Sequence, residues 1–382
     1  MIADSEQLVE RAQAATGLSD LGPDGWQEGL SRLVESARQD LPADNDVSIQ
    51  VETMITGRLA SRLRIEHWYH QRSGPTEPVM GPVVIHGLPR SGTTALQYLL
   101  SIGTTFRYQR RWEISDPVPP LGAVGDTHDP RRLAALERAA GPAGGSVQHI
   151  SEVDGPVDDG TILGLDFHNQ ELGYPLRGYT TWWRSSSLKT TYGYHERVLR
   201  LLHTVGPPRR WLVKAPYHNF HLDDLAAQYP DARFLMTHRD PVAAVASTCS
   251  TVATAQRNAL PQYTLSPKTL GAYLLEHLVE GLSRALAARA AIGEHRFLDI
   301  TQRELEADPV GTARRIEDWL GLQVDPSTGP AMTAWAAANA RGGRGEHRYR
   351  ADEYGLTDDR IRVAFRDYID RFDLVPERGD GP

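Results

Sequence analysis

One glycine-rich segment of the sequence has the residue types and spacing of a phosphate-binding loop. The segment Gly87-Leu88-Pro89-Arg90-Ser91-Gly92-Thr93-Thr94 follows a short apolar run at residues 83–85 and precedes a run typical of a helix at residues 95–100. Glycine permits a tight turn, and the N–H groups at the start of a helix face an anion with the helix dipole behind them. The residues predicted to bind phosphate are Arg90, Ser91, Gly92, Thr93 and Thr94.

This loop departs from the loop of nucleoside triphosphatases. Theirs ends in Gly-Lys-Ser/Thr, whereas here Thr93 follows the second glycine and the basic residue, Arg90, lies two places before that glycine. A triphosphatase would therefore lack its phosphate-bridging lysine. The alternative interpretation is a strand-to-helix turn that contains glycine without binding a ligand.

A second cationic residue follows another predicted strand. Arg239 comes after the apolar run at residues 233–236, and Ser247 lies eight residues beyond it. If a helix begins near Asp240, Arg239 lies at the mouth of that helix and Ser247 lies two turns inside it. A guanidinium group and a hydroxyl group in that arrangement can hold one phosphate.

Lys214 completes a set of three cations. It ends the apolar run at residues 211–213 and is one of only three lysines among 41 basic residues. The carboxyl ends of parallel strands meet at one edge of a sheet, so Arg90, Lys214 and Arg239 should project there together and bind a polyanion. The alternative for Lys214 is a surface lysine at the end of a strand.

The order of the predicted elements indicates an α/β fold. Apolar runs at residues 83–85, 211–213 and 233–236, with a fourth at 295–300, alternate with helical patterns, as in parallel βα units. We therefore predict a P-loop-like parallel β-sheet flanked by helices, in a domain at residues 81–382, with an N-terminal helical cap at residues 1–80. Helices are predicted at residues 6–15, 25–39, 46–70, 131–140, 267–291, 308–320 and 357–372, and an irregular excursion at residues 117–156.

Length and composition describe an ordinary folded protein. Of 382 residues, 40% are hydrophobic and 24% are charged, and the net charge of −8 argues against nucleic acid as a partner. The chain has neither a window of 18 apolar residues nor an N-terminal basic and apolar signal, so we expect no membrane span and no signal peptide. The single cysteine, Cys249, fits a reducing compartment, and we expect a cytoplasmic location.

Together, these motifs resemble those of a known family. The loop at residues 87–94, Lys214-Ala215-Pro216, and His238-Arg239-Asp240-Pro241 with Ser247 are similar in order and spacing to the sulfotransferases that use 3′-phosphoadenosine 5′-phosphosulfate (PAPS). The similarity is greatest to the bacterial branch related to tyrosylprotein sulfotransferases. It extends from residues 14–18 through Trp112-Glu113 to residues 345–349 and so covers most of the chain.

The resemblance implies how PAPS is bound. The loop would bind the 5′-phosphosulfate, and Arg239 with Ser247 would bind the 3′-phosphate that distinguishes PAPS from ATP. Sulfuryl transfer, like phosphoryl transfer, requires alignment of the reacting atoms and stabilisation of charge on the leaving phosphate, to which Arg90 and Lys214 are suited.

The C-terminal tail carries another basic cluster, at residues 341–348. As a lid over the nucleotide, this segment would bring His347 or Arg348 to the 3′-phosphate. The alternative is a solvated basic loop that contacts no ligand.

The acceptor hydroxyl needs a positioned general base as it attacks the sulfur. Glu113 resembles the glutamate that acts as the base in the tyrosylprotein branch, and we favour it. His218, four residues after Lys214, resembles the catalytic histidine of cytosolic small-molecule sulfotransferases and is the competing candidate. The alternative for each is a salt-bridged or helix-capping residue. Asp158 and Asp159 are weaker acidic candidates.

The implied reaction moves the sulfuryl group of PAPS to a hydroxyl group of a small-molecule or lipid acceptor and leaves 3′-phosphoadenosine 5′-phosphate (PAP). It needs no metal, and we assign none. A homodimer is left open. An aromatic cluster would either line an apolar acceptor pocket or belong to the core. Its members are Tyr174, Tyr179, Trp182, Trp183, Tyr192 and Tyr194.

Two other classes of protein compete with this interpretation. The first is a nucleotide kinase built on the same P-loop-type phosphate loop, which would require Mg²⁺. The segment His238-Arg239-Asp240 imitates a protein-kinase catalytic loop, but Val245 stands where that loop needs asparagine. The second is a nucleotide-sensing binding protein that keeps the loop and has lost the base.

Overall fold

The chain forms two compact units in a computed structural model. The first unit comprises Met1–Gly81, Arg107–Trp211 and Ala227–Pro230, and the second comprises Pro82–Phe106, Leu212–Ala226 and Asp231–Pro382. The first unit thus includes residues 107–211 besides the N-terminal helices, and the division into regions 1–80 and 81–382 stays a prediction. The structure describes residues 2–71, 79–119, 126–139, 152–203, 209–261, 263, 265–323, 325–339 and 350–376.

A five-stranded sheet carries the predicted phosphate loop. Its strand order is β2-β3-β1-β4-β5, and β1 pairs in parallel with β3 and β4, as β4 does with β5. All four predicted strands are confirmed. The fifth strand, β2, was not predicted, because no apolar run marks it. The strands are β1 (Val83–Gly87), β2 (Phe106–Arg107), β3 (Arg210–Lys214), β4 (Arg233–His238) and β5 (Phe297–Thr301).

The central position of β1 explains its sequence. Val83, Val84 and Ile85 are fully buried, because β1 has a neighbouring strand on each side and a parallel sheet is covered on both faces. A continuous run of branched apolar residues fits such a strand better than an alternating pattern.

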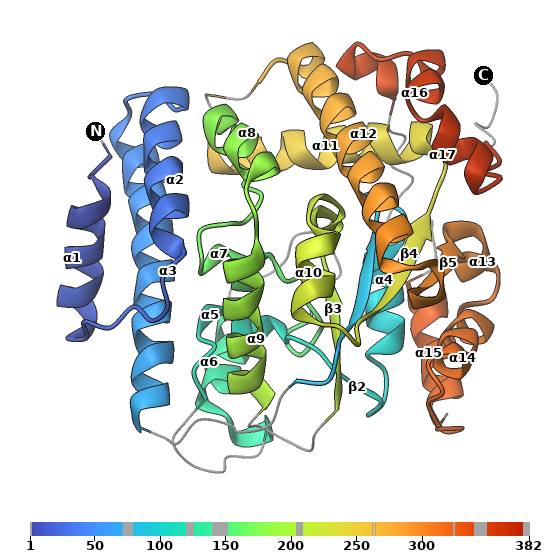
Figure 1. Cartoon of the computed structure of the whole chain (residues 1–382), viewed down its shortest axis with the longest axis horizontal. Helices are drawn as coiled ribbons and strands as arrows, with labels where there is room; N and C mark the ends of the chain where they lie inside the picture. Colours follow the sequence, from blue (N-terminus) through green and yellow to red (C-terminus); the bar gives the residue numbers. More distant parts are fainter. Residues whose placement is uncertain are drawn as a thin grey trace. The chain divides into compact units, whose positions relative to one another are not determined.

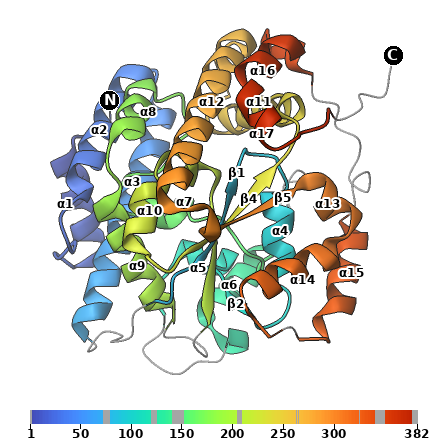
Figure 2. The same ribbon diagram turned by 45° about the vertical axis from the view of Figure 1, so that its right-hand side comes forward.

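Helices of the second unit cover the sheet in two groups. One group joins α4 with α13, α14 and α15, and the other joins α11 with α12 and α16; Figure 2 shows both beside β1, β4 and β5. The α-helices of this unit are α4 (Thr93–Leu100), α10 (Leu222–Gln228, which ends in the first unit), α11 (Pro241–Ala259), α12 (Pro267–Ile292), α13 (Gln302–Ala307), α14 (Pro309–Trp319), α15 (Thr328–Ala338), α16 (Asp358–Ala364) and α17 (Arg366–Arg371). The 3₁₀ helices are η2 (Pro216–Phe220), η3 (Glu294–Arg296) and η4 (Ala351–Tyr354).

The helix predicted at residues 357–372 is divided in two. Phe365 lies between α16 and α17 with φ −110° and ψ 18°, outside the helical region, and its ring is buried. Spacing of apolar residues alone continues through this point, so the break follows from the packing of Phe365 in the core.

The predicted N-terminal helices are present in the first unit. Helix α1 begins with a capping box in which Asp4 and Gln7 exchange side-chain and backbone hydrogen bonds. Helices α1, α2 and α3 lie side by side in Figure 1. The helices of this unit are α1 (Ser5–Thr16), α2 (Trp26–Asp40), α3 (Asn45–Gln71), α5 (Arg111–Ser115), η1 (Asp126–His128), α6 (Pro130–Ala139), α7 (Gly160–Gly164), α8 (Arg177–Ser185) and α9 (Lys189–His203).

A buried arginine organises the core of the first unit. The Arg62 side chain is 0% exposed; its Nε donates to the Leu21 carbonyl and its Nη2 to the Pro23 carbonyl, both at 3.0 Å. Its Nη1 donates to Asp166 Oδ1 at 2.8 Å, and its guanidinium lies 3.7 Å from the centre of the Tyr194 ring. One side chain therefore ties together three separate segments of chain.

Among the described residues, every helix is too short or too polar to cross a lipid bilayer.

Candidate active site

Two glycines shape the predicted phosphate loop between β1 and α4. Gly87 has φ +135°, and a Cβ atom there would lie 2.4 Å from the Thr237 carbonyl oxygen, so no other residue fits. Gly92 has φ +94° and precedes α4, which no side chain of the described residues caps. The start of α4 is therefore uncapped. Its first N–H groups, which include those of Thr93 and Thr94, have no side-chain acceptor among the described residues.

Ser91 holds the loop together through its side chain. Its hydroxyl is buried, donates to the Leu88 carbonyl at 2.5 Å, and lies 2.5 Å from Thr237 Oγ1. Thr237, on β4, also donates to the His86 carbonyl at 3.2 Å. Thr237 was not predicted from the motifs. Its position directly before the His238-Arg239-Asp240 segment is the feature of the sequence that could have indicated it.

Arg90 connects the loop with the segment after β4. Its backbone has φ +68°, which is uncommon for a residue other than glycine and occurs where surrounding contacts impose it, often at functional sites. Its Nε donates to Ser247 Oγ at 3.0 Å, and Arg239 Nη1 donates to the Arg90 carbonyl at 2.8 Å. The structure thus brings Arg90, Arg239 and Ser247 together, although 157 positions separate Arg90 from Ser247.

The helix predicted to begin near Asp240 does begin there. Asp240 is the N-cap of α11, its side chain accepts a hydrogen bond from the Val242 N–H at 3.2 Å, and Pro241 occupies the first helical position. Ser247 lies in this helix and is buried.

An ionic network supports the end of β4 next to Arg239. His238 Nε2 lies 2.8 Å from Asp299 Oδ1, and Arg289 donates to both oxygens of Asp299 at 2.6 and 2.8 Å. Burial opposes ionisation of Asp299, but the hydrogen bonds from Arg289 and His238 lower its pKa overall. The carboxylate is therefore charged, and the strand end that carries Arg239 is fixed.

Lys214 ends β3, directly beside β1. It lies opposite Ile85 in the parallel register, and its side chain is buried. The carboxyl ends of β1, β3 and β4 therefore place Lys214, the loop and Arg239 at one edge of the sheet.

His218 lies in η2, immediately after β3. Its side chain is fully buried, and the next residue, Asn219, fastens this turn to β1: the Asn219 amide nitrogen donates to the Gly87 carbonyl at 2.9 Å, and its oxygen accepts from His86 Nδ1 at 2.9 Å. Burial lowers the pKa of His86 to about 3, even though the bond to Asn219 favours the charged form. Asn219 was also missed by motif reasoning, although it directly follows His218.

Glu113 is enclosed in the first unit. Its side chain is 0% exposed, its Oε1 accepts a hydrogen bond from Arg107 Nη2, and its Oε2 accepts one from the Arg110 N–H at 2.9 Å. The Arg107 guanidinium in turn lies 4.7 Å from the centre of the Trp211 ring. Glu113 is thus both ion-paired and part of a capping box at the start of α5.

The remaining predicted residues fall into different surroundings. Asp159 is buried, with Oδ2 3.5 Å from His195 Nε2. His347 and Arg348 lie outside the described residues. Most of the aromatic cluster belongs to the core, since Tyr179, Trp183, Tyr192 and Tyr194 are all buried.

Within the described part of the chain, no three His, Cys, Asp or Glu side chains gather as metal ligands.

Comparisons with known proteins agree with this arrangement. A sequence profile of the sulfotransferase family matches residues 82–326, which is more than half of the chain. The structure of sulfotransferase STF9 from Mycobacterium avium superimposes with a TM-score of 0.89 at 28% identity, over 98% of each chain. Sulfotransferase STF1 from Mycobacterium tuberculosis H37Rv gives a TM-score of 0.83 at 25% identity, over 96% of this chain and 99% of that one. No curated protein matches the chain.

The matched region contains the loop, the ends of β3 and β4, and the Arg90, Arg239 and Ser247 contacts described above. The phosphate-loop geometry and the profile match therefore point to the same conclusion: this chain belongs to the sulfotransferase family.

Proposed function

We propose that this protein transfers the sulfuryl group of PAPS to a hydroxyl group of a small-molecule or lipid acceptor. The observation that carries the proposal is the pair of contacts that joins Arg90 to Ser247 and Arg239 to the Arg90 carbonyl. These contacts join the loop proposed to bind the 5′-phosphosulfate directly to the residues proposed to bind the 3′-phosphate. A cytoplasmic location and a homodimer stay predictions.

The donor would bind along the edge of the sheet. The uncapped start of α4, with the N–H groups of Gly92, Thr93 and Thr94, suits the 5′-phosphosulfate. The guanidinium of Arg239 and the hydroxyl of Ser247 suit the 3′-phosphate, which ATP and ADP do not have. The buried hydroxyl of Ser91 would support the loop from behind while the loop binds the donor.

The reaction requires one bond to form and one to break at sulfur. The acceptor oxygen forms a bond to sulfur as the bond between sulfur and the 5′-phosphate oxygen breaks, and PAP leaves with the electron pair of that bond. Arg90 and Lys214 would stabilise the charge that develops on the leaving phosphate. The proton of the acceptor hydroxyl passes to the general base.

Glu113 can accept that proton despite its hydrogen bonds. A carboxylate has about four lone-pair positions on its two oxygens, and the bonds from Arg107 and the Arg110 N–H occupy one on each oxygen. A lone pair on each oxygen is then left, and the ion pair holds the carboxylate in one orientation. Because the side chain is fully buried, an acceptor hydroxyl reaches it only when the groups that cover it move. We therefore propose Glu113 as the base, with His218 as the competing candidate.

The donor assignment is tested by nucleotide affinity. We expect PAP to bind at least about tenfold more tightly than ADP, equivalent to about 1.4 kcal/mol, because only PAP has the 3′-phosphate. In Arg239→Ala this preference should disappear, whereas Arg257→Ala, which removes an exposed arginine of the same helix as Ser247, should retain it. Isothermal calorimetry with both nucleotides measures the ratio of the PAP and ADP affinities. Equal affinities in the unmodified protein would contradict a PAPS donor. A Mg²⁺-dependent preference for ATP would favour a kinase.

The base assignment is tested with two acceptors of different acidity. An aliphatic alcohol such as hexanol needs a base, whereas p-nitrophenol is already ionised in mildly alkaline buffer and does not. Glu113→Gln should lower turnover of the alcohol about 10²- to 10⁴-fold and leave turnover of the phenolate and PAP affinity nearly unchanged. His218→Asn is the matched comparison, and release of PAP from PAPS is the measurement.

Each outcome of this comparison has a distinct meaning. If His218→Asn shows the selective loss and Glu113→Gln does not, His218 is the base. If Glu113→Gln lowers turnover of both acceptors equally, Glu113 is not the base and its ion pair with Arg107 has only a structural role.

A further inference from the structure

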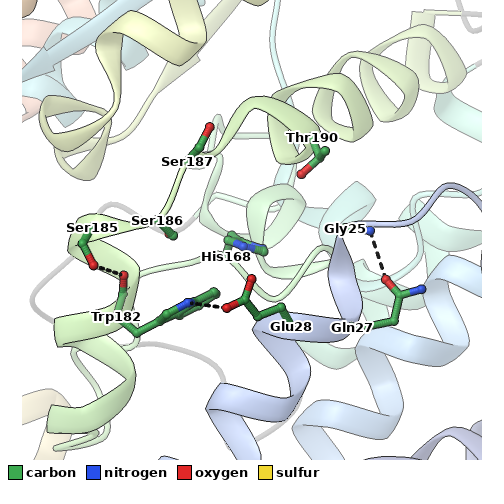
Figure 3. Close-up of a pocket in the computed structure, with 9 residues that line it drawn as sticks. All are labelled: Gly25, Gln27, Glu28, His168, Trp182, Ser185, Ser186, Ser187 and Thr190. Carbon is green, nitrogen blue, oxygen red and sulfur yellow. Dashed lines mark hydrogen bonds between the residues drawn. The ribbon is translucent and has the colours of Figure 1, made fainter.

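The first unit contains a cavity that the proposed reaction does not use. It has a volume of about 560 Å³, within the range of about 300–1,000 Å³ typical of small-molecule sites. It lies at the start of α2, the end of α8 and the start of α9, and Figure 3 shows its lining residues. The lining residues with polar or aromatic groups discussed below are Glu28, His168, Trp182, Ser186 and Thr190.

His168 supplies a hydrogen-bond acceptor to this cavity. The residue is only 4% exposed, and its Nδ1 lies 2.8 Å from the Asp166 carbonyl oxygen. A carbonyl oxygen can only accept, so Nδ1 carries a proton, and Nε2 has a lone pair whenever the ring carries no second proton. No described residue donates a hydrogen bond to Nε2, and the ring lies among the lining residues in Figure 3. A ligand hydroxyl can donate to Nε2 in place of water.

Trp182 supplies an aromatic surface whose orientation is fixed. Its Nε1 donates to Glu28 Oε1 at 3.1 Å, and its ring centre lies 4.9 Å from that of His168. Glu28 also lies 3.6 Å from Arg32, so its charge is partly balanced, while its side chain stays largely exposed. The two rings and the carboxylate therefore form one preorganised surface.

Hydroxyl groups line the other side of the cavity. Ser186 Oγ donates to the Trp183 carbonyl at 2.9 Å and so keeps its lone pairs for an incoming donor. The Thr190 side chain is exposed, so its hydroxyl is accessible to water or to a ligand. Gly25, with φ +128°, leaves room for that hydroxyl, because a Cβ there would lie 2.8 Å from Thr190 Oγ1.

We propose that this cavity binds an uncharged, polyhydroxylated ligand of the sugar type. Sugar hydroxyls both donate and accept, and so match His168 Nε2 and the Glu28 carboxylate, which accept, and the Thr190 hydroxyl, which can do either. The C–H faces of a sugar ring pack on an aromatic surface such as Trp182. An anion is disfavoured, since the described lining residues include a carboxylate and neither lysine nor arginine. An apolar ligand would displace water from these polar groups without replacing the hydrogen bonds of that water. The proposal concerns binding alone and does not depend on sulfuryl transfer.

Saturation-transfer NMR on the full chain tests this proposal with defined probes. Glucose, maltose and cellobiose represent the proposed class, and choline and hexanol represent cationic and apolar ligands. We expect at least one of the sugars to bind and the other two probes to bind more weakly. Binding of none of the three sugars would overturn the proposal, and so would tighter binding of choline or hexanol that is lost in Trp182→Leu. Hexanol bound as the sulfuryl acceptor should not be affected by that substitution.

Two substitutions connect binding with this cavity. Glu28→Gln keeps an acceptor for the Trp182 N–H but removes the charge, and should weaken the sugar about tenfold; Trp182→Leu should abolish binding. Glu35→Gln, an exposed residue of the same helix that does not line the cavity, is the matched control and should bind normally. Thermal unfolding verifies that each variant is folded, and unchanged affinity in Glu28→Gln and Trp182→Leu would show that the sugar binds elsewhere.

Discussion

Replacing Arg90 by alanine is expected to lower kcat by about 10²- to 10³-fold, the usual cost of removing one preorganised group that stabilises charge in a transition state. Arg90 lies in the phosphate loop, its Nε is held by Ser247 Oγ at 3.0 Å, and its backbone is held at φ +68°. A side chain fixed in this way is already oriented before the reaction, so its electrostatic contribution requires little reorganisation. Release of PAP from PAPS with p-nitrophenol as the acceptor measures the effect.

Two further variants separate charge from geometry at this position. Arg90→Lys keeps the positive charge but not the planar guanidinium, and should recover only part of the lost rate. Arg257→Ala should retain the full rate, because Arg257 is exposed on α11 and donates a hydrogen bond to Thr254 in the same helix. A rate in Arg90→Ala within threefold of the unmodified protein would contradict the proposed placement of PAPS at this loop.

Replacing Arg62 by methionine should destabilise the first unit by about 3–5 kcal/mol, the range measured when one partner of a buried ion pair is removed. Methionine has a similar length, so little volume is lost. The loss would instead leave the buried Asp166 carboxylate without its cation and the buried Leu21 carbonyl without its donor, and it would also remove the bond to the more exposed Pro23 carbonyl. The midpoint of urea unfolding, followed by a probe in the first unit, measures the change.

An exposed ion pair supplies the control for Arg62. Arg11 donates to Glu52 at 2.6 Å, but its side chain is 54% exposed, so Arg11→Met should cost no more than about 1 kcal/mol. Replacing both members of the buried pair, Arg62→Met with Asp166→Leu, should recover part of the stability by removing the unpaired charge. If Arg62→Met costs no more than Arg11→Met, the hydrogen bonds of Arg62 are not stabilising the core.

The strands and the phosphate loop could be predicted because their signals are local. A buried parallel strand needs a continuous apolar run, and residues 83–85, 211–213 and 233–236 have one. β2 could not be predicted, since a strand of two residues has no period of its own. The division between α16 and α17 was also missed, because the apolar spacing continues through Phe365 while its backbone does not.

Residues of the candidate site could be proposed from the sequence where a motif contains them, and not where only a tertiary contact involves them. Arg90, Arg239 and Ser247 stand in recognisable motifs, and they converge in the structure. Thr237 and Asn219 support the loop through bonds to Ser91, His86 and Gly87 that span more than 130 positions. A pattern within one segment cannot predict a hydrogen-bond partner that is so distant in the sequence.

The sequence by itself determined the α/β class, the three cations at the ends of predicted strands and the family resemblance, because backbone propensity and loop chemistry depend on neighbouring residues. Only the tertiary structure decided that the Ser91 hydroxyl is turned into the loop, that Glu113 is enclosed by Arg107 and the Arg110 N–H, and that His168 lines a cavity with Trp182. Each of these depends on which groups surround the side chain and exclude water from it once the chain has folded. That exclusion is a property of the folded chain, in which a polar atom must find a partner or remain available to a ligand.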